Sequence, residues 1–125
     1  MERRLKLIKQ FISVSTQVEF IHQYAGAPEE VSFLSYPHRH LLHITAEIEV
    51  FNDDRELEFI IVKRGLTKYL DTLNLTEVSN TSCETLGRGI LLYLTSHYGA
   101  NRDMTITVSE DGENGSILKY TKEEA

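Results

Sequence analysis

The stretch from residue 38 to residue 50 decides the fold, and it reads His38-Arg39-His40-Leu41-Leu42-His43-Ile44-Thr45-Ala46-Glu47-Ile48-Glu49-Val50. From position 42 onward its even positions are apolar, while its odd positions from 43 to 49 are polar or charged. This alternation is typical of a β-strand that buries one face. Because His38 and His40 share the even, apolar parity, we expect both imidazoles to point the same way at one end of that face.

A second strand of the same parity is predicted upstream, over about residues 5 to 21. Its even positions carry Ile12, Val14, Val18 and Phe20, and the parity continues to His22. If the two strands pair, His22 reaches the end of the sheet where His38 and His40 lie. Three converging imidazoles form the open, three-ligand site typical of catalytic zinc. We therefore predict a metal site made of these three histidines.

The rest of the chain predicts two helices followed by a hairpin. Apolar residues at 59, 62, 66, 69, 70 and 73 have helical spacing. A second helix is expected to begin at a capping box made by Thr81 and Glu84 and to end at Gly99. Strands are predicted over residues 104–110 and 117–120, with a tight loop at 111–115. This order predicts an α+β fold with one antiparallel sheet.

Composition limits the class of protein. A chain of 125 residues fits a single domain over residues 1–125. Its net charge of −6 argues against nucleic acid as a partner, since phosphate binding needs a basic surface. The single cysteine, Cys83, excludes an internal disulfide and favours a reducing, cytoplasmic location. Neither a signal peptide nor a membrane span is expected from the apolar runs.

The order of landmarks resembles the 6-pyruvoyl-tetrahydropterin synthase and 6-carboxytetrahydropterin synthase family. Residues 18–22 correspond to the family's F-x-x-x-H motif, and His38-Arg39-His40 corresponds to its H-G-H motif. The family's D-F, P-T-x-E-x-L, E-T and A-x-Y motifs resemble Glu58-Phe59, residues 81–86, Glu110-Asp111 and residues 118–120. The resemblance spans nearly the whole chain.

This resemblance implies the tunnelling fold, with a four-stranded antiparallel sheet, two helices on one face and the order β-β-α-α-β-β. In this fold the sheets of several protomers pair into a barrel, so a homo-oligomer, a trimer or a hexamer, is expected. The resemblance makes His22, His38 and His40 zinc ligands and Glu110 the anchor of a pterin ring. The implied function is conversion of a pterin such as dihydroneopterin triphosphate in pterin, folate or deazaguanine metabolism, including queuosine biosynthesis.

The chain departs from the family at its acid/base positions. Leu34 and Ser35 occupy the places of the family's cysteine or glutamate before H-G-H, and neither is an adequate base. Asp71 matches the aspartate of the family's acid/base pair, which implies a catalytic role, but Thr72 replaces the histidine of that pair. His97 is expected to pack on the apolar stripe of a helix, although its imidazole could replace a missing base.

Two functions therefore remain open. In one, the protein is a zinc-dependent carbon-oxygen lyase that uses relocated acid/base groups. In the other, it is a binding protein on the same scaffold that captures a pterin-, deazaguanine- or nucleotide-like ring without converting it. Retention of the three histidines favours the lyase, and loss of both base positions favours the binding protein.

Overall fold

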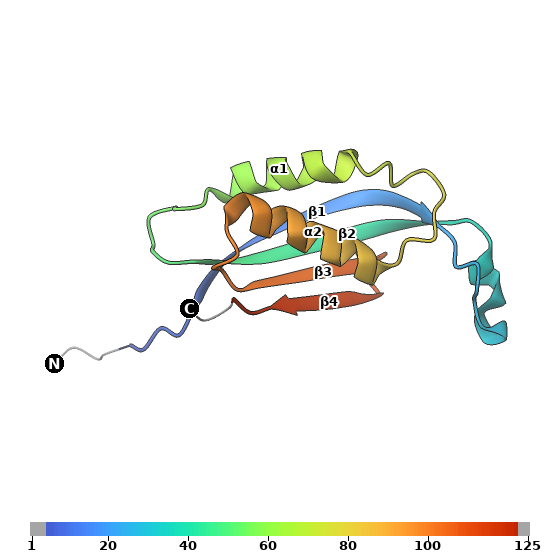
Figure 1. Cartoon of the computed structure of the whole chain (residues 1–125), viewed down its shortest axis with the longest axis horizontal. Coiled ribbons are helices and arrows are strands. Elements are labelled where there is room, and N and C mark those ends of the chain that lie inside the picture. The colour runs from blue at the N-terminus through green and yellow to red at the C-terminus, as the bar shows by residue number, and fades with distance from the viewer. Residues whose placement is uncertain (1–4, 123–125) are drawn as a thin grey trace.

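The computed structural model of the chain describes residues 5–122 and contains one four-stranded antiparallel sheet with strand order β1-β2-β3-β4. The strands are β1 (Gln10–His22), β2 (His38–Val50), β3 (Met104–Glu110) and β4 (Asn114–Tyr120). Helices α1 (Phe59–Asp71) and α2 (Cys83–Tyr98) both lie on one face of the sheet (Figure 1). The predicted α+β class, the antiparallel sheet and the order of strands and helices are confirmed.

The even-numbered face of the first two strands is the face that the helices cover. Ile44, Ala46 and Ile48 are fully buried, and strand β3 continues the same layer. The helices contribute one stripe each to this core. Their buried apolar side chains are Val62, Leu66, Leu70, Leu86, Ile90 and Leu94. The period-2 and helical patterns in the sequence therefore meet in one hydrophobic core.

Several element boundaries differ from the predicted ones. Strand β1 begins at Gln10, not at residue 5, because Gln10 pairs with Val50, the last residue of β2. No residue of β2 remains to pair with the preceding segment. Strand β4 begins at Asn114, which pairs with Glu110 across a three-residue turn. The turn is tight because Asp111 has a φ of +57° and Gly112 a φ of +75°.

The predicted capping box at the second helix is wrong by one residue. The N-cap of α2 is Ser82, whose side chain accepts a hydrogen bond from the backbone N–H of Thr85. Thr81 instead hydrogen-bonds through its hydroxyl to Ser79. The helix ends at Gly99, as predicted, with a φ of +107° that favours glycine.

Two connecting segments lie at the end of the sheet where β1 stops and β2 starts. The connection between these strands contains a 3-10 helix, η1 (Glu29–Ser35), and projects beyond the sheet (Figure 1). The segment between the helices runs beside the end of β1, because Leu75 and Ser79 accept backbone hydrogen bonds from Ile21 and Gln23.

Within residues 5–122, no helix combines the length and apolar character needed to cross a membrane.

Candidate metal centre

The three predicted histidines meet at this end of the sheet. His22 lies directly opposite His38 in the β1–β2 register, and His40 follows on the same face of β2. The ring centroid of His22 lies 4.4 Å from that of His38 and 5.2 Å from that of His40. One nitrogen from each ring lies within 4.8 Å of the other two. These three residues could hold a metal ion, and the convergence predicted from parity is confirmed.

Each imidazole is fixed by a hydrogen bond at the nitrogen that points away from the cluster. The contacts join His22 Nδ1 to Thr81 O at 2.9 Å, His38 Nδ1 to Tyr36 O at 2.8 Å and His40 Nδ1 to Asp111 Oδ2 at 2.7 Å. Since a carbonyl or carboxylate oxygen only accepts, each Nδ1 carries the proton and donates. In a neutral imidazole the lone pair then lies on Nε2, the atom that a metal would bind. This outer layer of acceptors is typical of histidines that ligate metals.

The Nε2 atoms of two of these rings are buried and make no hydrogen bond, although the Glu110 carboxylate lies near both. Among the described residues, neither His22 Nε2 nor His40 Nε2 has a hydrogen bond. Buried polar atoms without a partner are costly, and such a pair calls for a missing binding group. Nitrogen donors arranged in this way fit a borderline metal ion such as Zn²⁺, which favours imidazole and tolerates three protein ligands plus one open position.

Two consecutive carboxylates at the end of β3 frame the histidines. Asp111 accepts hydrogen bonds from His40 Nδ1 and from the backbone N–H of Leu41, at 2.7 and 2.9 Å. These two bonds hold the pKa of the Asp111 carboxyl below its usual range. The sequence predicts no role for Asp111, which stands where the family has threonine, so its contact with His40 is a finding of the structure. Glu110 lies on the other side, with Oε2 at 3.0 Å from His22 Nε2.

A pocket of about 520 Å³ opens beside the histidines. It is lined by the end of β1, the projecting connection and the first turn of α2, and includes His22, His38, Glu110, Tyr24, Leu34 and Glu84. Cys83 also lines it but is largely buried, and burial together with nearby Glu110 and Glu84 raises its thiol pKa to about 11. Cys83 is therefore a neutral thiol near pH 7, in keeping with the structural role expected of a buried cysteine.

No protein-family model matches this chain, and no curated protein matches it in sequence. The resemblance to the synthase family therefore stays a prediction. What is known of the site comes from the geometry of the chain itself.

At the family's acid/base positions, the hydroxyls of Ser35 and Thr72 already donate hydrogen bonds elsewhere. Leu34 lines the pocket, whereas the hydroxyl of Ser35 donates to the Ser32 carbonyl at 2.7 Å. Thr72 caps the end of α1 by donating to the Tyr69 carbonyl at 2.6 Å. Asp71 is exposed and borders a separate surface hollow along α1, so within one protomer it is not brought to the histidines.

The other two histidines lie away from the cluster. His43 is on the opposite face of β2, as its odd parity predicts, and its Nδ1 is 3.3 Å from Gln17 Nε2. His97 was expected to pack in the core, but it is exposed, with its ring stacked on Tyr93 at 5.4 Å between centroids. Because it lies in the last turn of α2, at the opposite end of the helix from the pocket, it is not brought to the histidine cluster within one protomer.

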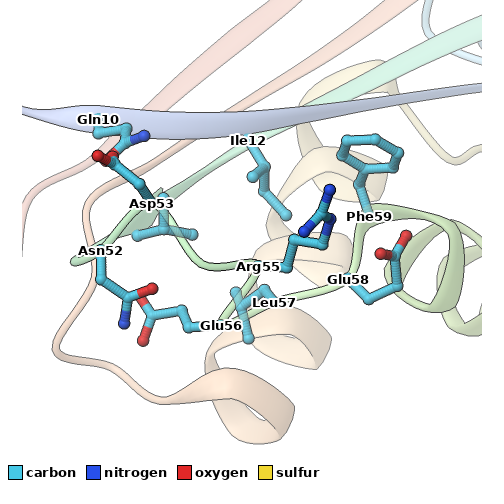
Figure 2. A pocket seen from close by; sticks show the side chains of 10 residues that line it. Gln10, Ile12, Asn52, Asp53, Arg55, Glu56, Leu57, Glu58 and Phe59 are labelled. Carbon is cyan, nitrogen blue, oxygen red and sulfur yellow. The ribbon is translucent and has the colours of Figure 1, made fainter.

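A smaller hollow, of about 180 Å³, lies at the far end of β1 and β2, and Figure 2 shows the side chains that line it. It is enclosed by the loop that follows β2 and by the first residues of β1. Its charged lining residues, Asp53, Arg55, Glu56 and Glu58, belong to that loop or to the start of α1. None of the residues predicted for the site lies here, so the histidine cluster and its pocket form the candidate site.

Proposed function

We propose that the chain is a divergent member of the 6-pyruvoyl- and 6-carboxytetrahydropterin synthase family and has the tunnelling fold. The observation that carries this proposal is the convergence of three imidazole Nε2 atoms beside a pocket large enough for a bicyclic ring. The order of strands and helices supports it, because the family motifs fall on the corresponding elements. The proposed metal is zinc, held by His22, His38 and His40.

The ligand that we propose is a pterin or a related purine-like ring. The pocket combines an apolar wall at Leu34 with the carboxylates of Glu84 and Glu110. Carboxylates accept the N–H groups that an amidine-like ring edge presents. A bound zinc ion would supply Lewis acidity toward a hydroxyl or carbonyl on the ring's side chain. The protein's own groups would hold the ring and shield it from water.

The first form of this function is a carbon-oxygen lyase acting on a substrate like dihydroneopterin triphosphate. A second form, capture of the ring without conversion, is favoured by one specific observation. Leu34 presents an apolar side chain to the pocket where the family has an acid/base group, and the Ser35 hydroxyl donates to a carbonyl. In the family fold a neighbouring subunit completes each site, so Asp71 would serve the lyase only from another protomer.

Two measurements on the zinc-loaded protein test these forms. Incubation with dihydroneopterin triphosphate, followed by chromatography, detects conversion, and calorimetric titration with a pterin detects binding. A new product supports the lyase. Binding without product supports the capture protein. Neither binding nor product with pterin and guanine-like rings would contradict the proposed ligand class.

A further inference from the structure

Glu110 occupies an unusual place beside two of the three histidines. It is the last residue of β3, where it pairs with Leu42, two residues beyond His40 on the neighbouring strand. Its Oε2 lies 3.0 Å from His22 Nε2 and 3.4 Å from His40 Nε2. The resemblance to the synthase family assigns Glu110 to the ring of the ligand, but in the structure its carboxylate faces the imidazoles.

The protonation of the rings makes this arrangement informative. His22 and His40 donate from Nδ1 to Thr81 and Asp111, so a neutral ring presents a lone pair at Nε2. A carboxylate oxygen also presents only lone pairs. Two acceptors that face each other at 3.0 Å repel unless positive charge lies between or beside them. That charge is either a proton or a metal cation.

The geometry favours the metal cation. Neither Nε2 makes a hydrogen bond, although Glu110 Oε2 is near enough to accept one, so the oxygen lies to the side of the direction in which Nε2 would donate. Two ligand atoms of one tetrahedral ion are placed in this way, because both point at the ion and not at each other. With bonds of about 2.0–2.1 Å to zinc, neighbouring ligand atoms lie about 3.3 Å apart. The separations of Glu110 Oε2 from His22 Nε2 and His40 Nε2, 3.0 and 3.4 Å, are close to this value. Glu110 is not in the group of ligand atoms that lie within 4.8 Å of one another, so its carboxylate has to turn toward His38 to share the ion.

We propose that Glu110 is a metal ligand and joins His22, His38 and His40 around the ion. This inference rests on the metal centre of the proposed function but departs from the ring-anchor role that the resemblance implies. A carboxylate also offsets one of the two charges of the cation, which three neutral imidazoles leave uncompensated. Any ligand that binds the metal must displace Glu110 or add a fifth bond.

Cobalt binding tests the proposal, because the visible absorption of Co²⁺ reports the number and kind of its ligands. Wild type, Glu110→Gln and Glu110→Ala are titrated with Co²⁺ alone, and zinc affinity is measured by competition with a chelator. The matched control is Glu113→Gln, an exposed carboxylate in the adjoining turn. Circular dichroism checks that every variant is folded.

Both Glu110 variants are expected to lose at least about 10-fold in zinc affinity, since even groups behind the ligands contribute that much. Their Co²⁺ spectra should also shift, because water replaces the carboxylate, while Glu113→Gln stays as wild type. If a folded Glu110→Gln variant matches wild type in affinity and spectrum, the inference is overturned while the three-histidine centre stands. If wild type binds neither Co²⁺ nor Zn²⁺, the metal centre itself is overturned.

Discussion

At the scale of single residues, the three histidines differ in what fixes them. Backbone carbonyls of Thr81 and Tyr36 orient His22 and His38, so these two orientations follow from the path of the chain. Only His40 is oriented by a side chain, that of Asp111. Substitutions can therefore distinguish the effect of losing a metal ligand from the effect of losing Asp111, the side chain that orients His40.

Replacement of His38 by alanine removes one of the proposed ligands. We expect zinc affinity to fall strongly in His38→Ala, because the ion loses one of its three imidazoles and keeps only His22, His40 and the proposed ligand Glu110. His43→Ala is the matched control, since His43 lies on the same strand but on the opposite face. Competition with a chelator measures the zinc affinity of the purified variants, and unchanged affinity in folded His38→Ala would contradict the assignment.

Asp111→Asn tests the positioning role of the Asp111 carboxylate. The asparagine amide turns one acceptor into a donor, so His40 Nδ1 and the Leu41 N–H can no longer both be satisfied. We expect zinc affinity to fall about 10- to 100-fold while the stoichiometry stays at one. Nitrogen NMR of the metal-free protein should show that His40 loses its fixed Nδ1–H tautomer. An unchanged tautomer and affinity would make Asp111 only a turn residue.

At the scale of elements, the hairpin of β3 and β4 places both carboxylates. Gly115 lies in this hairpin at a point where the strands approach closely. A Cβ atom there would lie 1.9 Å from the Val108 carbonyl oxygen and 2.6 Å from Ser109 Cα. The backbone has to move to relieve such contacts, so the requirement for glycine comes from packing.

Gly115→Ala is therefore expected to destabilise the fold by about 1–3 kcal/mol, the usual cost of forcing extra volume into a packed site. Gly26→Ala is the control, because the atom nearest to an added methyl carbon there would be Tyr24 Cε1 at 3.7 Å, an ordinary contact. Urea unfolding at pH 7 compares the two variants. If both unfold at the same urea concentration as wild type, the close approach at Gly115 has been relieved at no cost.

At the scale of the whole molecule, a network of charges ties the two ends of the described chain together. Asp103 accepts hydrogen bonds from the Lys9 ammonium and from the backbone N–H of Lys122, at 2.9 Å for the latter. Glu49, which is 5% exposed, accepts from the Lys122 ammonium at 3.0 Å and from the Asp103 N–H at 2.9 Å. The two buried carboxylates thus bind residues that precede β1 and follow β4.

The hydrogen bonds from Lys9 and Lys122 lower the pKa of the Asp103 carboxyl in the folded protein. Its stabilising contribution is complete above the unfolded pKa of about 3.9 and is lost as the pH falls through the lower folded value. We expect Asp103→Asn to unfold at a lower temperature than wild type at pH 7, with the difference narrowing in acid. Asp54→Asn, at an exposed loop position, should behave as wild type. If the difference in unfolding temperature between wild type and Asp103→Asn does not change with pH, the lowered pKa of Asp103 does not contribute to stability.

The sheet also has two outer strands, β1 and β4, with no further strand beside them in the described chain, although the segment between the helices pairs with the end of β1 at His22 and Ser79. Strands β1 and β4 each pair with one other strand of the sheet, and Phe11 and Ile117 are 40% and 66% exposed. Open sheet edges favour pairing with further strands. The proposed barrel would close them, so light scattering should show a stable trimer or hexamer. A monomer at micromolar concentration would count against the tunnelling-fold assembly.

The sequence by itself determined the strands, the helices and the face on which the histidines lie. Period-2 alternation fixes which side chains share a face, because successive residues of a strand point to opposite sides. This is why His22, His38 and His40 could be grouped, and why His43 could be placed on the other face. The end of a strand was harder to predict, because it depends on where the partner strand stops, as Gln10 and Val50 show.

Only the tertiary structure decided how the candidate metal centre is completed. The acceptors of the histidine Nδ1 atoms come from residues 36, 81 and 111, which lie between 2 and 71 positions away along the chain. No local pattern encodes such contacts, since they depend on how loops close over the end of the sheet. The different positions of the Glu110 and Asp111 side chains also depend on how the turn after β3 folds. The two are adjacent in sequence, yet the turn directs one toward the Nε2 side of the cluster and the other toward Nδ1 of His40.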